Sequence, residues 1–233
     1  MQILALETST ESGSCALWQD GRVLAADCPA GESHSVTLIP LVQQLLATAG
    51  SSFSALDAIA FGMGPGAFTG LRVACGIAQG MAVALDLPVL PVGSLECMAW
   101  AAGGERVLSL LDARMSEVYM GAFTRHVDGP QAVIDLQVLR PEEIRLPEEA
   151  GWLPEGCQIA GNALSAYPQL GERFSAPWQT LPDILPHARP LVELAALAFA
   201  RGEGQDPALA LPRYVRDKVA RTTAERLAVG GRI

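Results

Sequence analysis

The sequence predicts an α/β protein built from two similar lobes, each a mixed sheet with helices on its faces. Apolar runs of strand length alternate with longer segments of helical periodicity, and the pattern of the first hundred residues recurs in the second half. Hydrophobic residues make up 50% of the 233 positions, which is ample for a packed core. We therefore divide the chain into a first lobe at residues 1–103 and a second lobe at residues 104–233.

Three strands open the first lobe. Residues 3–7 and 14–19 are apolar runs of strand length, and Asp20–Gly21 is a strong hairpin-turn signal before a third run at 22–28. A helix follows, with leucine and valine at helical spacing, and Pro40 inside it predicts a kink or a late start. The rest of the lobe is predicted as a strand at 57–62, a helix at about 69–85, a strand at 87–92 and a helix at 94–102. This order is that of a ribonuclease H-like lobe.

The second half repeats the order of the first. A buried strand at 106–112 opens it, and Asp128–Gly129 stands where Asp20–Gly21 stood. The strands flanking that turn are predicted at 117–125 and 131–139, and they are followed by a partly helical stretch at 141–150, a strand at 157–161 and a helix at 189–202. Because corresponding features are offset by roughly one hundred residues, we infer a duplication of one lobe.

Two facing lobes of this kind define the actin, hexokinase and Hsp70 architecture, in which a nucleotide lies in the cleft between the lobes. Glu7 and Asp112 end the first strand of each lobe and would face that cleft. The alternative is that each carboxylate only caps the end of its strand.

A loop rich in glycine, FGMGPGAFTG, joins the strand at 57–62 to the next helix. It lacks the lysine and hydroxyl of a Walker loop, and it matches a dinucleotide fingerprint only formally, without that motif's acidic residue. Its backbone N–H groups are not covered by side chains and precede a helix N-terminus, which favours anions. Gly64 and Gly66, with Glu7 and Asp112, are therefore candidate contacts for a nucleotide or another anion. A tight turn fixed by Pro65 explains the glycines equally well.

The helix after this loop carries Gly76, Gly80 and Ala84 at intervals of four residues. Glycine in mid-helix costs about 1 kcal/mol relative to alanine, so two of them imply a packing reason. We expect this flat face to receive another helix, within the lobe or across a subunit boundary.

The charge and the cysteines exclude several classes of protein. A net charge of −9 disfavours a surface built mainly to hold a polyanion. The segment from Leu211 onward is nevertheless basic, and it meets RNA or an acidic partner, or is a solvated end. The five cysteines form no CxxC pair and read as reduced thiols, and neither a signal peptide nor a membrane span is expected, so we predict a cytoplasmic protein.

Catalytic constellations are sparse. His34 is followed four positions later by Leu38, so an HxxxH metal pair is missing, and no protein metal site is predicted. A GxSxG elbow is also missing, and the carboxylates fall short of a two-metal nuclease site.

Five segments together resemble the bacterial TsaB family, also called YeaZ. They occur in the family's order over nearly the whole chain and read ILALETST, HSVTLIPLVQQLL, AFGMGPGAFTGLRVACGIAQGMA, LLDARMSEVYMGAF and LPRYVRDKVA. The resemblance implies a non-catalytic paralogue of TsaD, the protein that transfers threonylcarbamoyl from threonylcarbamoyl-AMP to the adenosine 3′ of the tRNA anticodon. TsaD binds its metal through an HxxxH motif, and His34 with Leu38 stands where that pair would be.

The resemblance also implies partners. Family members pair with themselves or with TsaD through helices of the first lobe, and the ATPase TsaE joins the complex. The implied interface residues are His34, Leu38, Leu41, Val42, Leu45, Arg72, Gly76 and Gly80. No intrinsic cofactor is implied, although adenine nucleotide can bind near the junction with TsaD, and tRNA would be contacted only through the complex.

Three hypotheses follow for the function. The first is a scaffold that orders TsaD and performs no chemistry. The second is an ATPase or small-molecule kinase using the cleft between Glu7 and Asp112. The third is a metallopeptidase, as older naming of relatives suggests.

Overall fold

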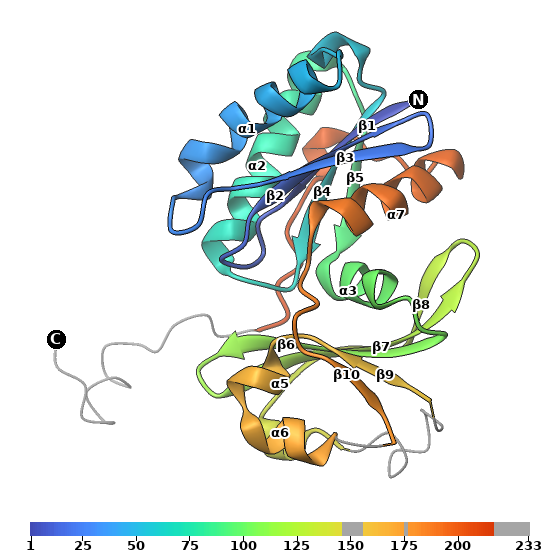
Figure 1. Cartoon of the computed structure of the whole chain (residues 1–233). Coiled ribbons are helices and arrows are strands. Elements are labelled where there is room, and N and C mark those ends of the chain that lie inside the picture. The colour runs from blue at the N-terminus through green and yellow to red at the C-terminus, as the bar shows by residue number, and fades with distance from the viewer. Residues whose placement is uncertain (146–155, 175–176, 217–233) are drawn as a thin grey trace, which may run out of the picture.

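Two five-stranded sheets frame the protein in the computed structural model, which describes residues 1–145, 156–174 and 177–216 (Figure 1). The first sheet has the order β3-β2-β1-β4-β5. Its strands are β1 (Gln2–Glu7), β2 (Ser14–Gln19), β3 (Arg22–Asp27), β4 (Ala58–Gly64) and β5 (Val89–Gly93). The first three strands are antiparallel neighbours, whereas β4 and β5 run parallel to β1.

The second sheet repeats this topology. Its order is β10-β9-β6-β7-β8. Read from β8 to β10, these strands correspond one by one to β3-β2-β1-β4-β5 of the first sheet. The strands are β6 (Arg106–Arg114), β7 (Glu117–His126), β8 (Gly129–Leu139), β9 (Gln158–Ala160) and β10 (Gln179–Leu181). The predicted fold class of two similar lobes with mixed sheets is therefore confirmed.

Helices cover both faces of the first sheet. On one face lie α1 (His34–Thr48) and α2 (Phe68–Leu85), packed on Leu4 and Leu6 of β1. On the other face lies α7 (Ala188–Ala200), packed on Ile3 and Ala5. Alternate residues of β1 thus enter two different cores, which explains why the strand reads as a continuous apolar run.

The lobes meet around α3 (Ser94–Ala102), which follows β5 and packs against β6 and β7 of the second sheet. The second lobe also contains α5 (Ala163–Ala166) and α6 (Pro168–Arg173). Short 3-10 turns lie at η1 (Phe53–Ala55), η2 (Pro141–Glu143) and η3 (Pro207–Leu209). Among the described helices, α2 is the one that is long and apolar enough to cross a membrane, and its buried residues pack on the first sheet.

The structure sharpens or corrects four local predictions. α1 begins at His34 and continues through Pro40, so of the kink or late start predicted there the late start does not occur. The second hairpin turns at Val127 and Asp128, and Gly129 already belongs to β8. Within the stretch predicted as partly helical, Pro141–Glu143 form a short 3-10 helix, and residues 146–150 lie outside the described part.

The fourth correction concerns α7, which the division at residue 103 assigns to the second lobe. It packs on the first sheet instead, next to Leu90 and Val92 of β5. After α7 the chain bridges the edge of β5, where Gln205 pairs with Val89, and then follows α2. We call residues 207–216 the strap.

Candidate functional site

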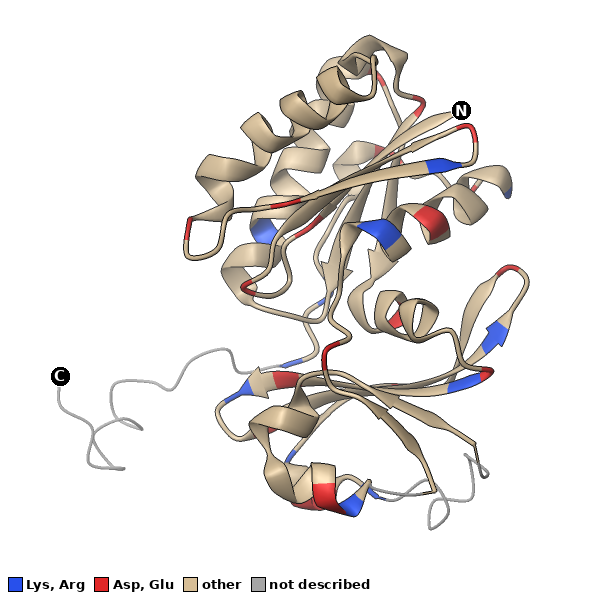
Figure 2. Ribbon diagram, viewed as in Figure 1, with Lys and Arg blue, Asp and Glu red and all other residues tan. Residues whose placement is uncertain are grey.

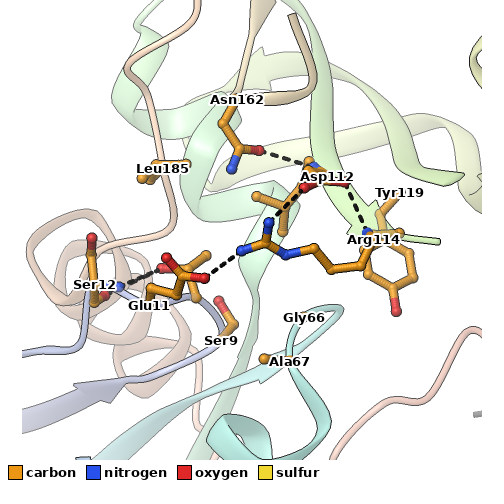
Figure 3. Close-up of a pocket in the computed structure, with 13 residues that line it drawn as sticks. Ser9, Glu11, Ser12, Gly66, Ala67, Asp112, Arg114, Tyr119, Asn162 and Leu185 are labelled. Carbon is orange, nitrogen blue, oxygen red and sulfur yellow. Dashed lines mark hydrogen bonds and ion pairs between the residues drawn. The ribbon is translucent and has the colours of Figure 1, made fainter. Parts of the chain in front are cut away.

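A cleft of about 220 Å³ lies between the lobes (Figure 3). The loop after β1 contributes one side, with Ser9 and Glu11, and the glycine loop contributes Gly66. The end of β6 contributes Asp112 and Arg114 from the second lobe. The first-strand acid of the second lobe therefore faces the cleft, as the duplication predicts.

Asp112 is held in place by hydrogen bonds. Its Oδ1 accepts from the hydroxyl of Tyr167 and from the backbone N of Arg114, both at 2.9 Å. Its own backbone N donates to Oδ1 of Asn162 at 2.9 Å. Burial and the bond to Asp112 raise the pKa of Tyr167 to about 12. The Asp112 carboxylate thus already accepts hydrogen bonds from within the second lobe.

Arg114 crosses the cleft. Its guanidinium pairs with Glu11 of the first lobe and lies 3.4 Å from Oδ2 of Asp112 (Figure 3). Among the residues that the structure describes, these three side chains are the charged groups lining the cleft, so two carboxylates face one cation. This balance disfavours the phosphates of a nucleotide unless a metal ion accompanies them.

Glu7, the corresponding acid of the first lobe, is fully buried and lies outside the cleft lining. Its Oε1 accepts from the backbone N of Ser9 at 2.6 Å, and its Oε2 accepts from the hydroxyl of Ser94 at 3.4 Å. Burial raises the pKa of this carboxyl. The structure therefore does not bring Glu7 and Asp112 together across one site, and Glu7 organises the end of β1.

The glycine loop packs against the segment that follows β1. A Cβ at Gly66 would come within 2.9 Å of Ser9 Cα, and a Cβ at Gly70 would overlap the carbonyl of Thr8. The backbone N of Ala67 donates to Ser9 O at 2.7 Å, so this amide of the loop already has a partner. Gly64, with a φ of +109°, lies beside the strap and not in the cleft lining. These contacts favour the tight-turn explanation of the glycines.

Most of the interface residues predicted on α1 face the core of the first lobe. Leu38, Val42 and Leu45 are buried in the core against the first sheet, and Leu41 packs partly against it. His34 begins the helix, and its Nε2 donates to Thr10 O at 3.0 Å. The surface of α1 instead carries residues the sequence reasoning missed, namely Val36, 70% exposed, and Ile39, 42% exposed. Apolar residues occur on both the buried and the exposed face of α1, so their spacing alone did not show which of them face the core.

On α2 the predicted residues are exposed. A Cβ added at Gly76 or Gly80 would meet nothing within 4 Å, so both glycines border open space. Arg72 lies on the same side of the helix, 4.0 Å from the ring centroid of Phe68, and its Nε donates to the hydroxyl of Tyr214 at 3.0 Å. The strap thus runs along one flank of the glycine face.

Exposed apolar side chains are concentrated on α2 and on the two elements beside it, α1 and the strap. Seven of the twelve large ones in the described residues lie on α1, α2 and the strap: Val36, Ile39, Phe68, Val83, Leu209, Leu211 and Tyr214. We call this surface the α1–α2 face. Arginine and lysine are sparse over the visible side of the first lobe (Figure 2). The basic segment predicted at the end of the chain lies mostly outside the described residues, apart from Arg213 and Arg216.

No group of three or more His, Cys, Asp or Glu side chains that could hold a metal ion occurs in the described ranges. Leu38, at the second position of the expected histidine pair, is a core residue.

Comparison with known proteins identifies the family. The family model described as "TsaD: tRNA N6-adenosine threonylcarbamoyltransferase" matches residues 29–223. The tRNA threonylcarbamoyladenosine biosynthesis protein TsaB of Escherichia coli K12 is 37% identical over 94% of this chain and 96% of its own length. The chain belongs to the TsaB family.

Structural comparison agrees with membership of the TsaB family. The solved structure of YeaZ from Pseudomonas aeruginosa is 41% identical, with a TM-score of 0.82 over 91% of this chain and 99% of that one. A tRNA N6-adenosine threonylcarbamoyltransferase from Neisseria meningitidis is 34% identical over 113 residues, which cover 41% of this chain and 32% of that protein. The TsaB family acts in the biosynthesis of threonylcarbamoyladenosine in tRNA, and this chain shares that role.

Proposed function

We propose that this chain is a non-catalytic accessory subunit that binds TsaD and activates it. TsaD would transfer threonylcarbamoyl from threonylcarbamoyl-AMP to the adenosine 3′ of the anticodon, while this chain fixes the arrangement of the complex. The observation that carries the proposal is the α1–α2 face, whose elements carry two exposed glycines and seven exposed apolar side chains. An apolar surface of this kind is typical of a partner-binding site.

The face is shaped to receive a helix. Without side chains at Gly76 and Gly80, the backbone of a partner helix can approach α2 closely. Val83 and Phe68 mark the two ends of this surface on α2, and they are 66% and 38% exposed. Such residues would anchor the contact, because the burial of apolar surface is the dominant favourable term in most protein–protein association.

The partner we propose is TsaD, whose relative in Neisseria meningitidis shares 113 aligned residues with this chain. Two similar surfaces can then meet about a local two-fold axis, and a homodimer of this chain would use the same face when TsaD is missing. TsaE would join as the ATPase of the complex, and tRNA would be contacted indirectly. We place this function in the cytoplasm.

The interlobe cleft supports the non-catalytic part of the proposal. Glu7 is buried, and Arg114 lies across the cleft between Glu11 and Asp112. We propose that the chain has no intrinsic cofactor and that adenine nucleotide, where it is needed, binds at the junction with TsaD. An ATPase, a kinase and a metallopeptidase are the alternatives, and no contact among the described residues of the cleft favours them.

Co-purification with TsaD tests the binding face. Gly76→Leu and Gly80→Leu fill the open space on α2 and should abolish the pairing, whereas Ala200→Leu should leave it intact. Ala200 is an exposed position of α7, which covers the opposite face of the first sheet. Pairing that survived both glycine substitutions would show that the partner binds elsewhere.

A modification assay tests the role. Unmodified tRNA incubated with threonylcarbamoyl-AMP and TsaD should gain threonylcarbamoyladenosine faster when this chain is added. The chain without TsaD should form no product. Product from the chain alone, or ATP turnover by the chain with Mg²⁺, would contradict a non-catalytic subunit.

A further inference from the structure

The turn between β6 and β7 has an unusual backbone. Three consecutive residues have left-handed φ values, +60° at Arg114, +56° at Met115 and +61° at Ser116. A two-residue hairpin turn of this hand normally uses Asn-Gly or Asp-Gly, as at Asp20–Gly21 in the first lobe. Strain of this kind persists only where surrounding contacts hold the backbone.

The contacts come from Arg216 of the strap. Its Nη2 donates to Ala113 O at 3.1 Å and to Arg114 O at 3.5 Å, and its Nη1 lies 3.5 Å from Met115 Sδ. The same guanidinium pairs with the carboxylate of Glu117, and the Arg216 side chain is only 16% exposed. One side chain of the strap therefore contacts the backbone on both sides of the left-handed turn.

The strap is attached to the first lobe as well. The backbone N of Arg213 donates to Met63 O of β4 at 2.7 Å. The hydroxyl of Tyr214 accepts from Arg72 of α2. The strap therefore spans both lobes, and the turn that it holds sends Arg114 back across the cleft to Glu11.

We propose that the strap is an interlobe clasp. Arg216 keeps the turn left-handed, the turn keeps Arg114 on Glu11, and the cleft is thereby held at one width. When Arg216 is released the turn relaxes, Arg114 leaves Glu11, and the cleft becomes accessible. This proposal does not depend on the binding of TsaD, because each contact in it lies within one chain.

Hydrogen–deuterium exchange on the full chain tests the clasp. In Arg216→Ala, the amides of residues 112–117 and of residues 9–12 should exchange at least tenfold faster than in the wild type. Arg213→Ala is the matched control, because it removes the same charge while the strap stays attached through the backbone N of residue 213. Faster exchange confined to the strap, or no change at all, would overturn the proposal.

Two further variants test the cause. With Met115→Gly and Ser116→Gly the left-handed turn no longer needs outside support, so adding Arg216→Ala should accelerate exchange at the turn less than threefold. An undiminished tenfold effect there would contradict the role of backbone strain. If Arg216→Ala unfolds the whole chain, the exchange rates of Glu117→Gln test the clasp instead, because this substitution removes the ion pair and leaves the contacts of Arg216 with the carbonyl oxygens. Faster exchange at the turn in Glu117→Gln supports the clasp, and wild-type rates refute it.

Discussion

Gly70 and Gly76 lie in the same helix, and alanine should have opposite effects at the two positions. At Gly76 a Cβ meets nothing within 4 Å, so Gly76→Ala should raise the free energy of unfolding by about 0.5–1 kcal/mol through helix propensity. At Gly70 the Cβ would lie well inside the 3.0 Å that real Cβ atoms keep from Thr8 O. Because both sides of that contact are backbone, α2 or the end of β1 must move.

The cost at Gly70 follows from what that movement disturbs. Overpacking in a well-packed site costs about 1–3 kcal/mol. The Thr8 hydroxyl also donates to Gly70 O at 2.7 Å, and losing such a bond adds about 1 kcal/mol. Subtracting the gain in propensity, we expect Gly70→Ala to lower the free energy of unfolding by roughly 1–3 kcal/mol.

Thermal unfolding at low protein concentration measures both variants, with a dilution series to remove any effect of dimer formation. For a chain of this size a change of 1 kcal/mol moves Tm by about 2–4 °C. Gly76→Ala should therefore raise Tm and Gly70→Ala should lower it. If both shifts had the same sign, the assignment of Gly70 to close packing and of Gly76 to open space would be refuted.

Three other substitutions are predicted from buried or paired groups. Burial raises the pKa of Glu7 above its ordinary value of 4.5. The free energy of unfolding of the wild type, relative to that of Glu7→Gln, should therefore be largest below pH 4.5 and fall as the pH rises through the raised pKa. A difference between the two proteins that stayed constant from pH 4 to 8 in urea unfolding would contradict this. Leu38→Ala should cost about 2–5 kcal/mol in the isolated chain, because Leu38 is a core residue; an unchanged Tm would place it at an interface instead. Trp100→Phe should cost about 1–2 kcal/mol, since Trp100 Nε1 donates to Glu193 at 2.8 Å; Glu193→Ala in the Trp100→Phe background should then add little.

Local signals predicted much of the fold. Apolar runs located the strands β1, β4 and β6, and Asp20–Gly21 marked a hairpin whose φ values are positive at both positions. The repeat of these signals predicted the duplicated topology. The short elements α5, α6 and β10 escaped notice, because three to six residues give too little periodicity to detect.

The parts of the site that depend on distant contacts were less accessible from sequence. Glu7 and Asp112 end the first strands of their lobes, yet only Glu7 is buried and accepts hydrogen bonds from Ser9 and Ser94. Arg216 belonged to a basic segment predicted to meet RNA, an acidic partner or solvent, and its contact with Glu117 of the same chain joins residues 99 positions apart. Such pairings are set by how the elements pack, and no local pattern carries them.

The return of α7 to the first sheet has a consequence for synthesis on the ribosome. Ile3 and Ala5 leave the exit tunnel long before the helix that covers them, which begins only at Ala188. The whole second lobe is made in between. One face of the first sheet therefore stays uncovered during most of translation, and the lobe that starts first is completed last.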